Sequence, residues 1–182
     1  RGVVTHTLRL EPNLPAIAFW PGVKSAELAC EVFNREEPGS TCFISGKTEE
    51  GLRRRLVADF RAGRVKRLMG VGVPTEGFDA PNAALIVMAR PTLSRGLFAQ
   101  MAGRGTRALA GVVDGLATAE ERKAAIGASG KPCMKILDFV GNAGKHSLVS
   151  AVDLLGGDYS DDEVKLAKKR EKKAAGPVDP AM

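Results

Sequence analysis

Long apolar runs and aromatic side chains are scarce in this sequence of 182 residues. No apolar run is long enough to cross a bilayer, and the first residues lack the charged-then-apolar pattern of a secretory signal. Both absences argue against a membrane protein and favour a cytoplasmic location. One Trp, one Tyr and seven Phe provide too few rings for a broad surface that stacks bases. Any nucleic acid is therefore expected to be held mainly through its backbone.

Cysteines are also few, and their number and spacing argue against a zinc site and against a disulfide framework. Cys30, Cys42 and Cys133 are far apart, odd in number and set among apolar residues. They lack the close pairing of zinc ligands and the even count of a disulfide framework. We expect reduced thiols in the core and no metal site.

Charge is biased toward the positive, with a net value of +6. Such a balance suits a polyanionic partner, but much of the excess lies in residues 165–173. A basic tail of this kind is equally typical of a solvated segment. Charge alone therefore leaves nucleic-acid binding open.

Short apolar runs alternate with helical patterns from residue 15 onward. Buried strands are predicted near 16–20, 41–45, 67–73, 84–89 and 134–139. Strands that are apolar on both faces and separated by helices predict an α/β fold with a mainly parallel sheet. Such sheets bind ligands at the carboxyl ends of their strands. That rule points to the segments after Ser45, Val73, Ala89 and Phe139.

The helices between these strands carry their own signals. A helix from about residue 48 is predicted to present Leu52, Leu56 and Phe60 as an apolar stripe and to end near Gly63. Ser94 is suited to cap the next helix. Residues 108–131 are rich in Ala, Gly and charge, which predicts a surface excursion with some helix.

Three regions follow from this pattern. Residues 1–14 show no clear period, and we expect them to be a linker from an N-terminal domain that is missing here. Residues 15–157 form the predicted domain, closed by a short helix over 147–155. Residues 158–182 are a charged tail, expected to be helical or disordered.

Gly46-Lys47-Thr48 resembles the end of a P-loop, but the full pattern is absent. A P-loop needs another glycine five residues before its second one, and Thr41 occupies that position. The predicted loop is also too short to surround phosphates with backbone N–H groups. The domain is therefore predicted to lack a phosphate-binding loop of its own.

Two other segments carry chemistry. In residues 71–81 a strand ends, the chain turns, and Asp79 is presented just before a proline, which is also what an ordinary turn looks like. In residues 100–107, Arg104 and Arg107 would share one side of a helical continuation, with Gly103 and Gly105 leaving room for another surface. Arginines at a helix end are common surface charges. Arginine is equally the side chain best suited to phosphates in a transition state.

The order of four motifs resembles the C-terminal RecA-like domain of superfamily-two helicases, closest to the DEAD/DEAH-related group with type III restriction and phage helicases. These motifs are Phe-Arg-Ala-Gly (60–63), Thr-Glu-Gly-Phe-Asp-Ala-Pro (75–81), Ala-Arg-Pro-Thr-x-Ser (89–94) and Gln-x-x-Gly-Arg-Gly-Thr-Arg (100–107). The resemblance spans residues 15–139 and implies a three-layer α/β/α fold of the P-loop NTPase type.

The resemblance also implies roles. Arg104 and Arg107 match the arginine fingers that face a γ-phosphate, while Gln100, Gly103, Gly77 and Asp79 match positions that contact the nucleotide. Ser45 and Gly46, and more weakly Thr92 and Ser94, match the nucleic-acid track. ATP and Mg²⁺ are expected to be held mainly by the missing N-terminal RecA-like domain, and no metal site is expected in this chain.

The leading hypothesis is the second motor domain of an ATP-dependent helicase or translocase, with DNA favoured over RNA as its substrate. On this hypothesis the isolated chain is inactive. An alternative is a non-catalytic adaptor, derived from such a domain, that binds nucleic acid or protein. A nucleotide-binding metabolic enzyme is a third hypothesis, weakened because it would need its own phosphate loop.

Overall fold

The computed structural model describes residues 2–71, 79–92 and 94–142. They belong to the first of the two units into which the chain divides, Arg1–Asn142. The predicted closing helix, the charged tail and Gly77 lie outside the described residues. No helix in these described ranges is long and apolar enough to span a bilayer.

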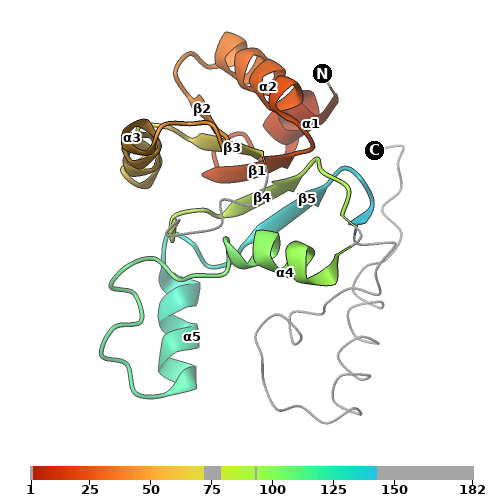
Figure 1. The fold of residues 1–182 in the computed structure, drawn as a ribbon. Helices are drawn as coiled ribbons and strands as arrows, with labels where there is room; N and C mark the ends of the chain where they lie inside the picture. Colours follow the sequence, from red (N-terminus) through yellow and green to blue (C-terminus); the bar gives the residue numbers. More distant parts are fainter. Residues whose placement is uncertain (1, 72–78, 93, 143–182) are drawn as a thin grey trace. The chain divides into compact units, whose positions relative to one another are not determined.

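A five-stranded parallel sheet forms the centre of this unit (Figure 1). The strand order is β2-β3-β1-β4-β5. The bounds of the strands are β1 (Ala16–Trp20), β2 (Thr41–Ile44), β3 (Arg67–Val71), β4 (Leu85–Met88) and β5 (Lys135–Asp138). Each lies within a run that the sequence predicts as a strand, so the parallel α/β prediction is confirmed.

Five helices accompany the sheet in the described ranges. Their bounds are α1 (Gly2–Leu10), α2 (Val23–Glu36), α3 (Glu50–Arg61), α4 (Arg95–Gly103) and α5 (Ala119–Ala128). The first was not expected, because residues 1–14 show no period in the sequence. Val4 and Thr7 are nevertheless buried, so this segment packs against the fold.

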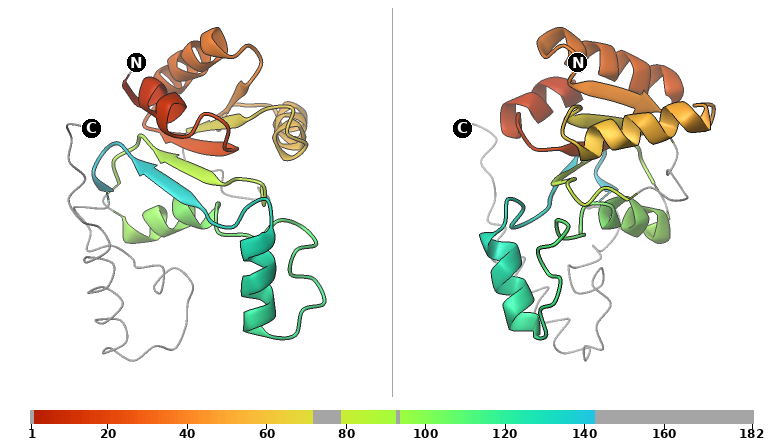
Figure 2. Two further views of the ribbon diagram at one scale, coloured as in Figure 1. Left: turned by 180° about the vertical axis from the view of Figure 1, so that it is seen from behind. Right: turned by 90° about the vertical axis from the view of Figure 1, so that its left-hand side faces the viewer.

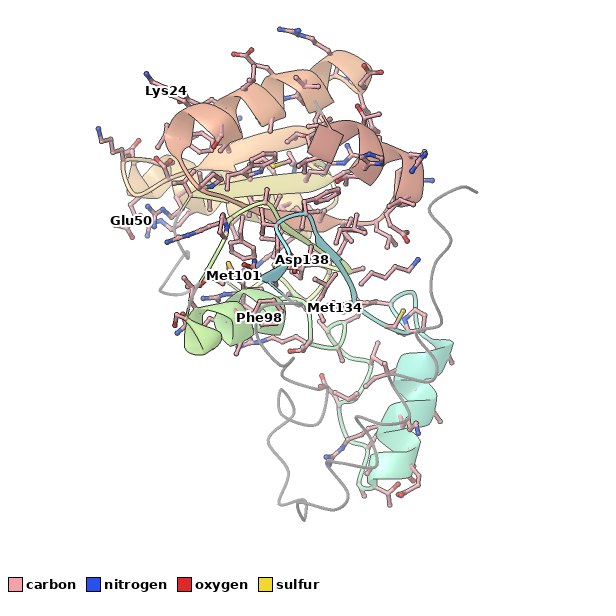
Figure 3. All side chains as sticks on the ribbon, turned by 90° about the vertical axis from the view of Figure 1, so that its right-hand side faces the viewer. Lys24, Glu50, Phe98, Met101, Met134 and Asp138 are labelled. Atoms are coloured by element: carbon pink, nitrogen blue, oxygen red, sulfur yellow. The ribbon has the colours of Figure 1, made fainter. Side chains whose placement is uncertain are left out.

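Every residue of β1 is buried, so apolar side chains pack against both faces of the sheet. Ala16, Ala18 and Trp20 pack with Val4 of α1 and Phe33 of α2. Side chains alternate along a strand, so Ile17 and Phe19 point to the opposite face. There α4 covers the sheet with buried Phe98 and Met101 (Figures 1 and 3). The arrangement gives the three layers that the resemblance implies.

Of two predicted helical segments, the first differs from its prediction and the second agrees with it. In α3, Phe60 is fully buried, whereas Leu52 is 47% exposed, so the apolar stripe is shorter than predicted. The segment 108–131 contains α5, which buries none of its residues and projects away from the sheet (Figure 2). Its first turn is stabilised by a capping box between Thr118 and Glu121. The predicted surface excursion is confirmed.

Helix ends follow the expected signals. Ser94 accepts a hydrogen bond from the Leu97 N–H at 3.2 Å at the start of α4. Gly63 follows the last turn of α3 with φ of +73°, a conformation that glycine adopts without strain. Both predicted caps are confirmed.

The three cysteines do not share one environment. Cys30 and Cys42 are half-buried, and burial raises the pKa of the Cys42 thiol to about 12. Cys133 is exposed, because it lies just before β5 rather than inside the strand. The prediction of core thiols is therefore wrong for Cys133.

The buried side chain of Arg67 connects several segments near the amino ends of the strands. Arg67, the first residue of β3, is 1% exposed and donates to Glu37 Oε2 at 3.0 Å, Ser40 Oγ at 3.1 Å and Pro12 O at 2.6 Å. Its guanidinium also lies 5.0 Å from the centre of the Phe33 ring. Hydrogen bonds from Lys66 and Arg67 lower the pKa of Glu37. One side chain thus connects the segment after α1, the end of α2 and β3.

We predict that Arg67→Met lowers the free energy of unfolding by about 3 kcal/mol, because it leaves buried partners unsatisfied. Arg35→Met is the control, since Arg35 makes an exposed i,i+4 ion pair with Glu31, and should lose about 0.5 kcal/mol or less. Urea denaturation of both variants measures the difference. Similar losses for the two would show that the Arg67 contacts add nothing beyond surface charge.

Candidate functional site

Two of the predicted site segments lie at the carboxyl ends of strands. Ser45 directly follows β2, and the segment containing Thr92 and Ser94 lies between β4 and α4. Since all five strands are parallel, these segments share the edge at which such sheets bind ligands. Ser45, Gly46, Thr92 and Ser94 therefore lie near the carboxyl ends of the strands, and their nucleic-acid-binding role stays a prediction.

The loop after β2 is closed by its own hydrogen bonds. The Ser45 N–H donates to Thr48 Oγ1 at 2.9 Å, the Thr48 N–H to Ser45 O at 3.1 Å and the Lys47 N–H to Ser45 Oγ at 3.2 Å. In a P-loop, backbone N–H groups like these three would instead point at the bound phosphates. Gly46 remains exposed at the tip. In this loop, the N–H groups of Ser45, Lys47 and Thr48 are therefore bonded within the loop and do not form a phosphate cradle.

The side chain of Asn142 positions the segment after β4 through two hydrogen bonds. Its side chain accepts from the Thr92 N–H at 2.9 Å and donates to Arg90 O at 2.9 Å. Thr92 is itself buried, and its Oγ1 accepts from the Ser94 N–H at 3.2 Å. Thr92 consequently shapes this loop from within, while Ser94 is exposed. Asn142 lacked a sequence signal beyond following the last strand.

Asp79 and Arg107 meet in an ion pair. The Arg107 Nη1 lies 2.8 Å from Asp79 Oδ2, with side-chain exposures of 64% and 44%. The other oxygen, Asp79 Oδ1, is buried without a hydrogen-bond partner among the described residues. The sequence placed these two residues in separate motifs, and only the fold brings them together.

This pair lies away from the carboxyl edge, and the residues directly after Val73, to which the sequence rule pointed, lie outside the described residues. The chain has returned toward the amino ends of the strands by Ala84, whose N–H donates to Pro15 O at 2.9 Å. Arg107 comes after α4, which starts at the carboxyl edge and runs back along the sheet (Figure 1). A parallel connection must return to the opposite edge, so residues late in it leave the carboxyl end.

The backbone around Asp79 is fastened to α3. The Arg61 Nε donates to Asp79 O, and the Asn82 amide donates to Phe60 O at 2.8 Å. In the sequence, Arg61 belongs to the Phe-Arg-Ala-Gly motif (60–63). Its observed role is to position the segment that carries Asp79.

A buried lysine connects this segment to the arginine motif. Lys131 is 6% exposed, and its Nζ donates to Pro81 O at 2.7 Å and to Arg107 O at 2.7 Å. Desolvation by burial lowers its pKa. The sequence offered no signal for Lys131, because a single lysine before a strand looks like any surface charge.

The chain after α4 does not continue as an α-helix, contrary to the prediction. Arg104, Gly105 and Thr106 donate their N–H groups three residues back, to Met101 O at 3.4 Å, Ala102 O at 3.0 Å and Gly103 O at 3.4 Å. Bonds of this span belong to the tighter 3₁₀ turn. Arg104 lies in this turn and is half-buried, and Arg107 follows it on the surface.

The two glycines of this motif have different surroundings. A Cβ on Gly103 would meet nothing within 4 Å, whereas one on Gly105 would lie 2.4 Å from Met134 Sδ and 3.1 Å from Ile86 Cγ1. Gly103 therefore leaves room for another surface, as predicted. Gly105 instead allows close packing on the sheet beside Met134, labelled in Figure 3. Gln100, on α4, is exposed.

Within the described ranges, no cluster of three His, Cys, Asp or Glu side chains could hold a metal ion. The chemistry available near Arg107 is instead cationic. Exposed guanidinium groups bind anions such as phosphate through several hydrogen bonds at once. The described site can therefore supply positive charge to an anion that is held elsewhere.

The described residues form a parallel α/β sheet with helices on both faces, an architecture that RecA-like domains share. Comparison with known families extends this assignment. The model of the helicase conserved C-terminal domain matches residues 3–109. The chain belongs to this family, which confirms the resemblance seen in its motifs.

Two curated relatives share sequence with the chain. IRC3 of Saccharomyces cerevisiae, whose name places it among ATP-dependent helicases, is 33% identical over 135 residues, covering 74% of this chain and 17% of that protein. The 51.5 kDa protein of a Lactococcus phage is 41% identical over 106 residues, covering 58% and 23%. The chain thus spans less than a quarter of either relative.

Solved structures share the fold at lower identity. The HsdR fragment of a type I restriction enzyme from Vibrio vulnificus has a TM-score of 0.57 at 22% identity, covering 79% of this chain and 26% of that one. Dbp5 of S. cerevisiae, bound to RNA and ADP BeF3, has a TM-score of 0.55 at 22% identity, covering 94% and 41%. Both confirm the RecA-like architecture.

We predict that Gly105→Ala lowers the free energy of unfolding by about 1 to 2 kcal/mol, because the added methyl group overpacks the contact with Met134 and Ile86. Gly103→Ala is the matched control, two residues away, and should leave stability unchanged or raise it by about 0.5 kcal/mol. Thermal and urea denaturation provide the measurement. Equal tolerance of alanine at both positions would contradict the proposed packing constraint.

Proposed function

We propose that this chain is the second motor domain of an ATP-dependent helicase or translocase that acts on nucleic acid. Arg104 and Arg107 serve as its arginine fingers. The observation that carries the proposal is the exposed Arg107–Asp79 pair at 2.8 Å, in a domain that lacks a phosphate loop of its own. A guanidinium placed in this way complements an anion bound by another domain.

The strength of the Arg107–Asp79 contact suits a reversible role. Exposed ion pairs contribute only about 0 to 1 kcal/mol, so an arriving phosphate can replace Asp79 as the partner of Arg107. A phosphate offers several charged oxygens to the planar guanidinium and is the stronger partner. Asp79 thereby holds the arginine near its working position before the nucleotide arrives.

We place ATP and Mg²⁺ mainly on an N-terminal RecA-like domain of the same polypeptide. Such a metal ion neutralises charge on the transferring phosphate when it is bound. From this chain, Gln100 and Gly103 on α4, together with Asp79 and Gly77, would contact the nucleotide. On α4, Gln100 is exposed and Gly103 is half-buried, which supports a contact with the nucleotide for these two residues. The role of Gly77 is proposed only from its place in the Thr-Glu-Gly-Phe-Asp-Ala-Pro motif (75–81).

The nucleic-acid track runs, in this proposal, along the carboxyl edge of the sheet. Gly46 and Ser94 are exposed there, and Ser45 and Thr92 shape the two loops. Contacts of this kind read the sugar–phosphate chain rather than base identity. We favour DNA over RNA because the motifs resemble those of type III restriction and phage helicases.

Arg107→Ala in the intact protein should reduce the turnover number for ATP about a thousandfold or more, as expected for loss of an arginine finger. The dissociation constant for ATP should change by about threefold or less, because binding energy comes mainly from the other domain. Steady-state ATPase assays and nucleotide titration measure the two quantities. Arg35→Ala on α2 is the control and should leave both unchanged. Parallel losses of binding and turnover would argue against a finger role for Arg107.

The isolated chain should hydrolyse ATP no faster than a protein-free blank, with or without single-stranded DNA. The reason is that its described residues provide no loop to hold the triphosphate. A phosphate-release assay over a range of ATP concentrations tests this, with the intact protein as positive control. Robust hydrolysis by the isolated chain would refute the proposed division of labour.

A further inference from the structure

The proposed nucleotide site is formed by two separate segments of the chain. One half is the segment 79–82, fastened to α3 by Arg61 and Asn82. The other is the turn that ends at Arg107, after α4. The Arg107–Asp79 ion pair links them through exposed side chains, which is a weak connection. A stronger one is needed to keep the arginine at a defined distance from the carboxylate.

Lys131 makes that connection through the backbone. Its Nζ lies 2.7 Å from Pro81 O and 2.7 Å from Arg107 O, so one ammonium group bonds to both segments. Pro81 is two residues from Asp79, and the second acceptor belongs to the arginine itself. With the side chain 6% exposed, water does not compete strongly for these bonds. Hydrogen bonds from charged donors are the stronger class.

The position of Lys131 in the chain fits this task. It lies four residues before β5 (Lys135–Asp138), and its own N–H donates to Ser129 Oγ at 3.1 Å. The donor and both acceptors all lie in irregular segments. Neither carbonyl belongs to a helix or strand that could satisfy it. The lysine thus fixes two segments that lack regular hydrogen bonding.

We infer that Lys131 is a positioning residue for ATP hydrolysis, holding the Arg107 backbone in register with the segment that carries Asp79. This inference rests on the proposed function. Removing the ammonium group frees both carbonyls and lets the arginine shift relative to the phosphate. A misplacement of about 1 Å can lower catalytic rates about a hundredfold. The lysine does not touch the nucleotide, so ATP affinity should be preserved.

Lys131→Met in the intact protein is the direct test, because methionine keeps the length and removes the donors. We expect the turnover number to fall about ten- to a hundredfold, with the dissociation constant for ATP within about threefold. Lys135→Met is the matched control, since Lys135 is an exposed lysine four residues further on that pairs with Glu11. That control should lose less than about twofold in turnover.

A double mutant separates positioning from a general loss of structure. If Lys131 acts through Arg107, adding Lys131→Met to Arg107→Ala should reduce the residual turnover by no more than about twofold. A lysine that only stabilises the fold would lower turnover by the same factor in both backgrounds, and that result would overturn the inference. Full turnover in a folded Lys131→Met variant would overturn it as well.

Folding of each variant is checked by circular dichroism and thermal denaturation. If Lys131→Met does not fold, Lys131→Gln replaces it, because glutamine keeps an N–H₂ donor on a shorter side chain, and the same two criteria apply. The outcomes also separate the two levels of the proposal. Normal turnover in Arg107→Ala refutes the motor function, whereas a large loss there without coupling to Lys131 refutes only the positioning role.

Discussion

Parallel pairing of β1 with both β3 and β4 is the constraint on which the rest of the structure depends. Each parallel neighbour requires a connection that returns from the carboxyl edge to the amino edge. The registers Trp20 to Val71 and Phe19 to Met88 bring the carboxyl ends into line. This one pattern creates the edge assigned to the nucleic-acid track and also carries residues 79–82 and 104–107 away from it, to a second site.

The second site combines contacts of different strength. The Arg107–Asp79 pair is exposed and weak, so the guanidinium can exchange one anion for another. Beneath it, Lys131 bonds to the Pro81 and Arg107 carbonyls in a buried position. In the proposed function, a side chain that exchanges partners is thus carried on a backbone that is held in place. Gly105, packed against Met134 and Ile86, holds the same turn from its other side.

Much of this arrangement was predictable from local pattern. All five strands, the Ser94 cap and the exposed excursion over 108–131 lie where the sequence predicted them, because apolar runs and capping residues act over short distances. The prediction failed where burial depends on distant elements. Residues 2–10 form a helix without a clear period, Leu52 is exposed, and Cys133 lies outside the core. At Gly105, an expected opening to another surface is filled by Met134 from before β5.

The sequence by itself determined the family, through the order and spacing of motifs that include Asp79, Arg104 and Arg107. It also determined the parallel sheet and the absence of a complete P-loop pattern. Only the tertiary structure decided which of these residues meet. Arg107 reaches Asp79 across 28 positions, and Lys131 reaches Pro81 across 50. Such pairings arise from how crossovers fold back over a sheet, and that geometry has no signature in any short stretch of sequence.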